Sequence, residues 1–359
     1  MARRRRSDSH RIVRWLWTSR RPDARLARLA LVPASELWRL GTFLKTTAFD
    51  RGWLPVRDLP LPSVAVGNLT VGGSGKTPIA VWIARYYAAK GLIPGIVLRG
   101  YGGDETLVHK DSVPTARVVA CPDRVSGTEQ ALAAGAQVVV LDDAYQRLDI
   151  RRDLNIVLVS AETSRAVRWL LPAGPWREGL EALNRADALI VTRKRATAGA
   201  ASRLAEELQR EIRGPVARVH LGLQQLEGLV SREPRPASTV AGKRVVVASA
   251  IADPEAFVAQ IKATGAAVQV ATWNDHHAYR DEDVAWLAHA ARRADHVVIT
   301  EKDAVKLRDR WPANTLEPLV AMLDVEWESG ERDLTAALDA VVRTVEPAAS
   351  HGDSHTSHR

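Results

Sequence analysis

The chain has 359 residues, of which 46% are hydrophobic and 26% charged, and it carries a formal net charge of +8. This length is enough for two domains with full cores, and the composition excludes a disordered or fibrous protein. No apolar run is long enough to span a bilayer. The single cysteine, Cys121, excludes an internal disulfide and a cysteine zinc cluster, which fits a reducing cytoplasm.

Positive charge is concentrated in the first 60 residues, which hold fourteen Lys and Arg but five Asp and Glu. The run Arg3–Arg6 is followed by two stretches in which apolar residues, tryptophans among them, recur every three to four positions between arginines. This spacing predicts a basic amphipathic helix of the kind that lies on an anionic membrane surface. The alternatives are a helix packed on the protein's own body and, less favoured because no recognition motif follows, a nucleic-acid-binding arm. We predict residues 1–50 to be a membrane-facing arm.

The strongest chemical motif begins after an apolar segment, Ser63–Val66. The next residues, Gly67-Asn-Leu-Thr-Val-Gly-Gly-Ser-Gly-Lys-Thr-Pro78, predict a glycine-rich turn that leads into a helix ending near Gly91. In such a turn, backbone N–H groups and the helix N-terminus bind phosphate, Lys76 reaches the terminal phosphates and Thr77 binds Mg²⁺. The motif therefore predicts an ATP site formed by Thr70, Val71, Gly72, Gly73, Ser74, Gly75, Lys76 and Thr77.

One position departs from the usual phosphate-loop pattern, G-x-x-x-x-G-K-[ST]. Thr70 stands where the first glycine is usual, so an ordinary glycine turn before a helix is the alternative. A second motif supports the nucleotide site, because the apolar segment Gln137–Leu141 ends in Asp142 and Asp143, as a metal-holding strand does. The carboxyl ends of parallel strands share one edge of a sheet. We therefore predict that Thr77 holds Mg²⁺ together with Asp142 or Asp143.

Further strands and helices alternate along the chain. Apolar segments at Asn155–Ser160 and Ala188–Thr192 are followed by a more polar stretch, Arg213–Lys243, that suits a linker. Beyond it the pattern predicts strand, helix, strand, helix and strand at Arg244–Ala248, Asp253–Ala263, Ala267–Thr272, Asp281–Ala294 and His296–Thr300. This alternation predicts parallel, doubly wound sheets. The polar end of the chain, residues 347–359, is predicted to be disordered.

Six short motifs lie between residues 65 and 306, about two-thirds of the chain. They are Gly67-Asn-Leu-Thr-Val-Gly-Gly-Ser-Gly-Lys-Thr-Pro78, Leu98-Arg-Gly-Tyr-Gly102, Asp142-Asp143-Ala-Tyr-Gln146, Leu171-Pro-Ala-Gly-Pro-Trp-Arg-Glu178, Asn274-Asp-His-His-Ala-Tyr279 and Thr300-Glu-Lys-Asp-Ala-Val-Lys306. In content and order they resemble the tetraacyldisaccharide 4′-kinase family, the lipid A 4′-kinases. The resemblance implies an α/β fold of two Rossmann-like, P-loop-type lobes with mostly parallel sheets, joined by a β-ribbon linker, plus an N-terminal amphipathic helix.

The resemblance also implies the activity. Members of this family transfer the γ-phosphate of ATP to the 4′-hydroxyl of a tetraacyldisaccharide 1-phosphate, a lipid A precursor. They act at the cytoplasmic face of the inner membrane of Gram-negative bacteria, so a peripheral protein without a transmembrane span is expected. The expected partners are the acylated disaccharide lipid and the anionic membrane surface, with no nucleic acid and no obligate protein partner. The domains are expected at 1–50 (arm), 51–215 (P-loop lobe), 216–243 (linker), 244–346 (second lobe) and 347–359 (tail).

The same resemblance guides the choice of catalytic residues. Asp104, in Gly103-Asp104-Glu105-Thr106, matches the family's base, although the insert that usually precedes it is absent, and His276 matches the histidine that pairs with it. From the residues alone, Asp104 would be a turn residue and His276 a surface histidine. Arg177 follows a Gly-Pro turn that suits a phosphate contact, and Lys76 completes the catalytic set. Weaker candidates for contact with substrate or nucleotide are Arg99, Arg124, Gln146, Asp275, His277, Lys302 and Asp303.

Two departures from the family's Asp-Asp-Gly-aromatic-Gln-His pattern concern the metal site. Ala144 stands for the glycine and Arg147 for the histidine, and Ala144 would be strained if its backbone needed a positive φ. Two other functions remain open: another P-loop ATPase, GTPase or ligase, and a non-enzymatic, membrane-associated protein that uses a nucleotide as a switch. A GTPase is disfavoured because Thr300-Glu-Lys302-Asp303 only partly resembles the base-reading Asn/Thr-Lys-x-Asp motif.

Overall fold

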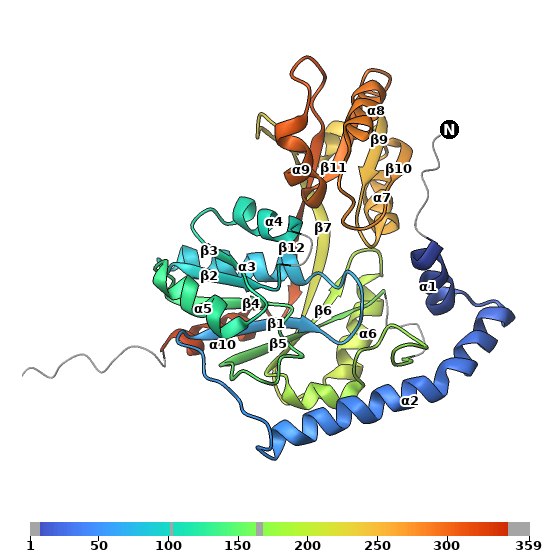
Figure 1. The fold of residues 1–359 in the computed structure, drawn as a ribbon. Helices are drawn as coiled ribbons and strands as arrows, with labels where there is room; N and C mark the ends of the chain where they lie inside the picture. Colours follow the sequence, from blue (N-terminus) through green and yellow to red (C-terminus); the bar gives the residue numbers. More distant parts are fainter. Residues whose placement is uncertain (1–7, 101–102, 163–167, 344–359) are drawn as a thin grey trace, which may run out of the picture.

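The fold consists of two N-terminal helices followed by a long mixed sheet with helices between its strands (Figure 1). The computed structural model describes residues 8–100, 103–162 and 168–343. The predicted arginine run Arg3–Arg6 and the predicted tail 347–359 lie outside the described residues. Helices α1 (Asp8–Thr18) and α2 (Pro22–Asp50) precede a twelve-stranded sheet with the order β10-β9-β11-β12-β7-β6-β5-β1-β4-β2-β3, in which β8 pairs with β7. The sheet confirms a mostly parallel α/β fold.

One half of the sheet, the P-loop half, consists of six parallel strands. They are β1 (Ser63–Asn68), β2 (Pro94–Leu98), β3 (Arg117–Ala120), β4 (Val138–Asp142), β5 (Leu154–Ser160) and β6 (Ala188–Arg193). Helices α3 (Lys76–Ala89), α4 (Asp104–Ser112), α5 (Arg124–Ala133) and α6 (Ala198–Leu208) connect or follow them, with the short 3-10 helix Leu180–Arg185 before β6.

The central strands of this half are apolar on both faces because both faces are covered. Val64 and Val66 pack in one core with α3, whereas Ala65 between them packs in another core with α5. Alternate residues of a strand point to opposite faces, so a strand covered on both sides needs an unbroken apolar run. This requirement explains why β1, β4, β5 and β6 were predictable from sequence.

The other half, here called the distal half, repeats the alternation on a smaller scale. Its strands are β9 (Arg244–Ser249), β10 (Ala267–Thr272) and β11 (His296–Thr300), all parallel, and its helices are α7 (Pro254–Ala263), α8 (Asp281–Ala291) and α9 (Glu301–Leu307). Helix α7 begins as predicted, since the Asp253 side chain accepts a hydrogen bond from Ala256 N. The predicted order of strands and helices is confirmed here.

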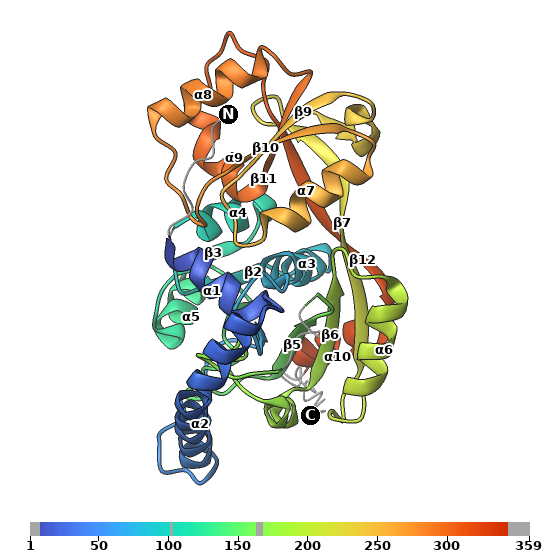
Figure 2. The ribbon, with the colours of Figure 1, turned by 90° about the vertical axis from the view of Figure 1, so that its right-hand side faces the viewer.

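Two long antiparallel strands, β7 (Val216–Gly228) and β12 (Leu319–Ser329), connect the halves. Strand β7 continues the P-loop half beside β6, and β12 continues the distal half beside β11. Figure 2 shows this pair of strands passing from one half to the other. The short strand β8 (Pro234–Pro236) pairs with β7, and two 3-10 helices lie at Ala237–Val240 and Arg308–Arg310.

The last described helix, α10 (Glu331–Arg343), lies in the P-loop half, although residues 244–346 were expected to form the second lobe. Its Leu334, Leu338 and Val341 recur every three to four residues and are buried in the core that contains β1 and α3. The hydroxyl of Tyr87 on α3 also donates to the main-chain O of Leu338 at 2.9 Å. The chain returns to the first half because β12 ends there.

Helix α2 packs along the segment that follows β5. Ser35 Oγ donates to Leu170 O at 3.0 Å, and Trp38 Nε1 donates to Arg177 O at 2.8 Å. The opposite side of α2 carries exposed leucines. In the described part of the chain, none of the helices combines the length and the apolarity needed to cross a bilayer.

The docking of α10 leads to a stability prediction. Leu338→Ala removes a fully buried side chain and should lower the free energy of unfolding by about 2–5 kcal/mol, because a cavity remains in the core. The exposed Leu132 on α5 provides the control, and Leu132→Ala should change it by less than about 0.5 kcal/mol. Urea denaturation measures both. If Leu338→Ala were as stable as the unchanged protein, α10 would not belong to this core.

Candidate functional site

The glycine-rich segment between β1 and α3 adopts the strand, turn and helix arrangement that the motif predicts. Gly75 has φ 90°, and a Cβ there would lie 2.2 Å from Leu221 Cδ1, so only glycine fits. Thr70 forms a β-bridge with Trp176 and is not among the residues with positive φ. The usual glycine is therefore not required at Thr70, and the departure from the motif leaves the turn intact.

Lys76 begins α3 and points toward the end of β4. Its Nζ donates to Asn68 Oδ1 at 3.3 Å and lies 3.6 Å from Asp143 Oδ1. Asn68 Nδ2 in turn donates to Ser74 Oγ at 2.7 Å, which ties the last residue of β1 to the turn. The helix N-terminus and the ammonium group together provide a positive site for a polyphosphate.

Asp142 ends β4 and Asp143 follows it, at the same sheet edge as the turn, since β4 pairs in parallel with β1. Asp142 is buried, and His109 Nε2 lies 2.9 Å from its Oδ2. Burial alone would raise the pKa of Asp142, but the hydrogen bond from His109 and the charge of Lys76 lower it below its ordinary value. Asp142 is thus held as a carboxylate.

These carboxylates fit a magnesium ion. The second oxygen of Asp142, Oδ1, is buried and has no hydrogen-bond partner in the structure. Buried polar atoms normally have a partner, so this oxygen is suited to bind a metal ion. Among the described residues there is no group of three or more His, Cys, Asp or Glu side chains suited to a metal. Mg²⁺ beside a phosphate loop does not need one, because it keeps waters and phosphate oxygens as ligands. Asp142 and Asp143 lie where such an ion would be held, and the assignment of Thr77, Asp142 and Asp143 as its ligands stays a prediction.

Asp104 is the first residue of α4 and is only 2% exposed. His276 Nδ1 lies 2.8 Å from its Oδ1, and Lys306 Nζ lies 2.9 Å from its Oδ2. Burial would raise the pKa of Asp104, but Lys306 and then His276 outweigh it and lower that pKa below its ordinary value. Asp104 is therefore a buried, paired carboxylate and not a solvent-exposed turn residue.

Two of the candidate residues have backbone conformations that residues other than glycine rarely adopt. Asp143 has φ 52° and His276 has φ 58°, both in the left-handed region. Such conformations cost free energy and are concentrated at functional sites. The positive φ falls on Asp143 and not on Ala144, whose N donates to Val66 O at 3.1 Å. The alanine in place of the family's glycine is therefore unstrained.

Arg177 and Gln146 lie beside Asp143. Arg177 Nη1 is 3.3 Å from Asp143 Oδ1 and 3.4 Å from Gln146 Oε1. Gln146 Nε2 donates to Asn68 O at 2.8 Å and to Glu178 Oε2 at 3.1 Å. The two predicted residues therefore belong to one network with the end of β1, and Arg177 leaves part of its guanidinium available for an anion.

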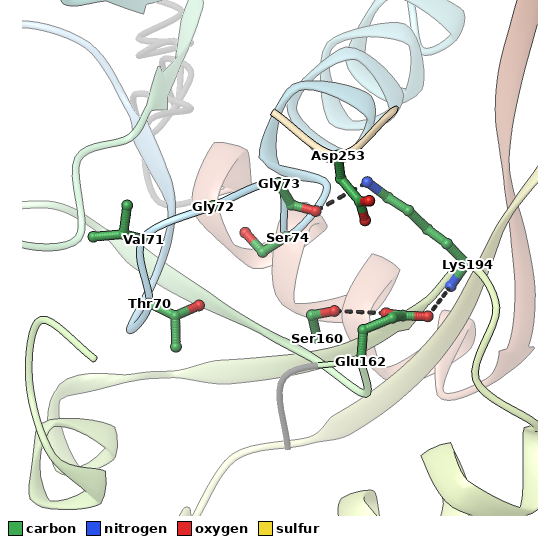
Figure 3. Close-up of a pocket in the computed structure, with 9 residues that line it drawn as sticks. All are labelled: Thr70, Val71, Gly72, Gly73, Ser74, Ser160, Glu162, Lys194 and Asp253. Carbon is green, nitrogen blue, oxygen red and sulfur yellow. Dashed lines mark hydrogen bonds between the residues drawn. The ribbon is translucent and has the colours of Figure 1, made fainter. Parts of the chain in front are cut away.

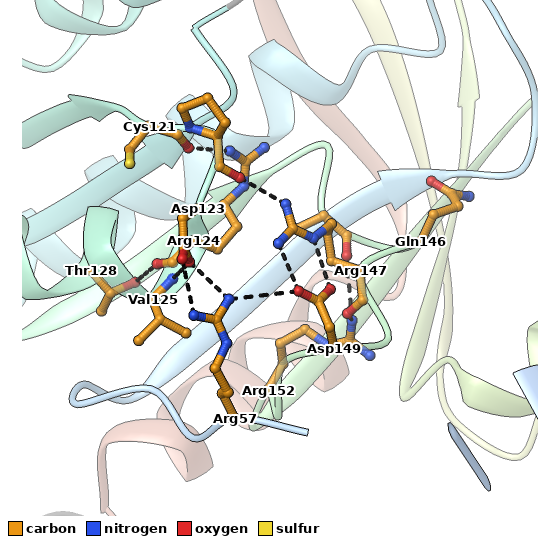
Figure 4. A network of polar contacts seen from close by, with 12 residues as sticks. Arg57, Cys121, Asp123, Arg124, Val125, Thr128, Gln146, Arg147, Asp149 and Arg152 are labelled. Carbon is orange, nitrogen blue, oxygen red and sulfur yellow. Dashed lines mark hydrogen bonds and ion pairs between the residues drawn. The ribbon is translucent and has the colours of Figure 1, made fainter. Parts of the chain in front are cut away.

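The second departure, Arg147, belongs to a network of ion pairs beyond β4 (Figure 4). Its guanidinium donates to both carboxylate oxygens of Asp149, at 2.8 and 2.7 Å, and to Pro122 O at 2.7 Å. Arg57 makes a similar two-point contact with Asp123. Arg147 thus joins the loop after β4 to the loop after β3.

Several of the weaker candidates have structural partners. Arg124 is buried and donates to the main-chain O of Cys121 and of Asp142. Asp303 is fully buried and accepts from Thr300, Tyr279 and Ala250 N. His277 Nε2 lies 2.9 Å from Asp283 Oδ2. These contacts connect the loops around the site, and a contact of the three side chains with substrate or nucleotide stays a prediction.

Lys302 and Asp275 lie near Asp104. Lys302 Nζ donates to Glu105 Oε1 at 2.7 Å, directly beside Asp104. Asp275 Oδ2 lies 3.7 Å from His276 Nε2, on the far side of the ring. Arg99 is exposed. The last two residues of its motif, 101–102, lie outside the described residues.

The structure adds a pocket that the sequence did not reveal (Figure 3). Lys194, which follows β6, donates from Nζ to Gly73 O at 2.9 Å, and Glu162 accepts the N–H groups of Lys194, Arg195 and Ala196. Burial would raise the pKa of Glu162, but the Ser160 hydroxyl and these N–H groups lower it to about 2. The pocket lies beside the turn between β1 and α3. Its lining residues are Thr70, Val71, Gly72, Gly73, Ser74, Ser160, Glu162, Lys194 and Asp253.

The chain is similar to known proteins in sequence and in fold. A family model described as LpxK, tetraacyldisaccharide-1-P 4′-kinase, matches residues 27–106 and 102–343. Tetraacyldisaccharide 4′-kinase from Chlorobaculum parvum is 32% identical over 318 residues, covering 80% of this chain and 86% of the relative. The enzyme of that name from Aromatoleum aromaticum is 34% identical over 321 residues, covering 84% and 90%. The crystal structure of LpxK from Aquifex aeolicus in complex with ATP has a TM-score of 0.70 and 26% identity, covering 88% of this chain and 99% of that one.

The free oxygen of Asp142 yields a prediction about metal binding. In Asp142→Asn, the Mg²⁺ concentration needed for half of the ATP-dependent rise in melting temperature should increase at least tenfold, because a charged ligand is lost. Asp58→Asn, which changes an exposed carboxylate, is the control and should leave that concentration unchanged. Each variant is compared with its own melting temperature without ATP. An unchanged Mg²⁺ midpoint in Asp142→Asn would exclude this residue as a ligand.

Proposed function

The chain belongs to the tetraacyldisaccharide 4′-kinase family, and we propose that its site transfers the γ-phosphoryl group of ATP to the 4′-hydroxyl of an acylated disaccharide 1-phosphate. One observation carries the assignment of the residues. Helix α4 places Asp104 against His276 of the distal half, and the same helix places His109 against Asp142 at the end of β4. One short helix thus carries Asp104, the proposed base, and also contacts Asp142, the proposed metal ligand.

Binding of ATP is assigned to the turn and to α3. The backbone N–H groups of residues 70–77 and the N-terminus of α3 surround the phosphates, and Lys76 neutralises charge on the β- and γ-phosphates. Thr77, Asp142 and Asp143 would hold Mg²⁺, which would supply further charge compensation. Because phosphoryl transfer demands little covalent chemistry from the protein, positioning and charge make up most of its task.

Asp104 is assigned as the base. The 4′-hydroxyl oxygen attacks the γ-phosphorus, the bond to the β-phosphate oxygen breaks, and the hydroxyl proton passes to Asp104, leaving ADP and the lipid phosphate. His276 orients the carboxylate through Nδ1 and can pass the proton on to solvent. Arg177, beside Asp143, is placed to contact the phosphoryl group during transfer.

The arrangement of the sheet supports two lobes. The P-loop half and the distal half have separate apolar cores, and β7 and β12 form the ribbon between them. We assign the linker to this ribbon, so it includes residues 319–329 in addition to the expected 216–243.

Helix α2 is assigned to the membrane. Its exposed leucines lie on one face at helical spacing, opposite the face that carries Ala24, Ser35 and Thr46. These leucines are all more than half exposed: Leu26, Leu29, Leu37, Leu40 and Leu44. A stripe of this kind beside arginines suits the anionic cytoplasmic surface of the inner membrane, where the lipid substrate is found.

The kinase assignment is tested by transfer of label. With γ-labelled ATP and a lipid A disaccharide 1-phosphate that lacks the 4′-phosphate, the protein should place label in the lipid. Lys76→Ala and Asp104→Asn should each reduce the rate by about 10²–10⁴, because charge compensation or proton acceptance is lost. Lys262→Ala, a change on the exposed side of α7, is the control. Label found only as free phosphate would contradict the proposed function.

The membrane assignment is tested with vesicles of phosphatidylglycerol and phosphatidylethanolamine. The double variant Leu37→Glu/Leu44→Glu should bind them at least tenfold more weakly in co-sedimentation, because each replaced leucine loses its apolar burial and adds a repelled charge. Leu132→Glu adds the same charge on an exposed part of α5 and serves as the control. If the double variant binds like the unchanged protein, α2 does not contact the membrane.

A further inference from the structure

Lys306 lies in the last turn of α9 and contacts the carboxylate assigned as the base. Its Nζ is 2.9 Å from Asp104 Oδ2, and it also donates to the main-chain O of His277 at 3.3 Å. The Lys306 side chain is 15% exposed and that of Asp104 is 1% exposed. Because both groups are largely removed from water, their attraction is stronger than that of a surface ion pair.

The contacts of Asp104 fix the plane of its carboxylate. Oδ1 accepts from Glu105 N at 3.1 Å and lies 2.8 Å from His276 Nδ1. Oδ2 lies 2.9 Å from the same nitrogen and 2.9 Å from Lys306 Nζ. With a backbone N–H at one oxygen, an ammonium at the other and the imidazole between them, the group has little rotational freedom.

Other ion pairs already attach α4 to the distal half and its ribbon. Lys302 pairs with Glu105, and Asp111 at the other end of α4 pairs with Arg232 and Arg308. The attachment of the helix therefore does not depend on Lys306. Lys306 differs from these pairs because it places an ammonium group directly on the Asp104 carboxylate.

We propose that Lys306 is a positioning residue of the kinase reaction, which holds Asp104 oriented and ionised so that it can accept the proton of the 4′-hydroxyl. This inference rests on the proposed function, in which Asp104 is the base. A triphosphate beside Asp104 favours the protonated, neutral form of the carboxylate, and the ammonium of Lys306 opposes that effect. Glu105 and Asp275 add negative charge nearby, while Lys302 and His276 add positive charge.

The proposal predicts how activity depends on pH. Burial raises the pKa of Asp104, and the hydrogen bond and charge of Lys306, followed by those of His276, lower it. Without Lys306 the effect of burial remains, so the pKa of Asp104 rises. A base with a raised pKa is protonated at a higher pH. The acidic limb of the kcat profile should therefore move to higher pH.

The test compares pH profiles of three variants with the unchanged protein, using ATP and the lipid acceptor in detergent micelles. Lys306→Met should lower kcat, leave the KM for ATP unchanged within about twofold, and move the acidic limb upward by about one unit or more. Lys306→Arg keeps the charge and should keep the limb in place, with a smaller loss of kcat. Arg232→Met breaks a different ion pair of α4 and should also keep the limb in place.

Two outcomes overturn the proposal. One is a Lys306→Met variant whose kcat falls by the same factor at every pH, which would show a purely structural role. The other is an upward shift of the acidic limb by a full pH unit in Lys306→Arg. If Lys306→Met fails to fold, the comparison of Lys306→Arg with the unchanged protein decides the question. Asp104→Asn separates the inference from its premise: full activity there contradicts the assignment of the base, whereas an inactive Asp104→Asn with an unshifted limb in Lys306→Met rejects only the role of Lys306.

Discussion

Two contacts of helix α4, one at Asp104 and one at His109, determine how the site is assembled. At its start, Asp104 is held by His276 and Lys306 from the distal half. Five residues later, His109 is held by Asp142 at the end of β4. Each contact joins a carboxylate to a nitrogen in a place largely closed to water, where an unpaired partner would be costly. Helix α4 therefore cannot shift toward either half without breaking one of these pairs, and Asp104 keeps its place relative to Asp142 at the end of β4.

The parts of the site that sequence alone predicts are those encoded locally. The turn from Gly67 to Thr77 and the carboxylates after β4 were predictable because strand, turn and helix signals lie within a few residues of each other. Asp104 and His276 were assigned by resemblance to a family, since 172 residues separate them and no periodicity links such distant positions. Their contact at 2.8 Å supplies the physical reason for the assignment.

What was missed depends on contacts between distant segments. Lys306 stood within a quoted motif without a role, His109 lay in a segment with no strong pattern, and Lys194 followed an ordinary buried strand. Each acquires its partner only when parallel strands bring their carboxyl ends to one edge. The location of α10 was missed for the same reason: its amphipathic pattern shows that one face is buried, but not against which half.

The central claim is that the nucleotide is bound in the turn beside Lys76 with its terminal phosphate facing Asp104. The most direct test is a crystal structure of the chain with Mg²⁺ and a non-hydrolysable ATP analogue. We expect phosphates on the backbone N–H groups of residues 70–77, the metal at Asp142 or Asp143, and the γ-phosphorus within about 7 Å of Asp104, so that one hydroxyl oxygen can contact both. A nucleotide bound away from the turn, or a γ-phosphate on the side of α3 remote from Asp104, would contradict it.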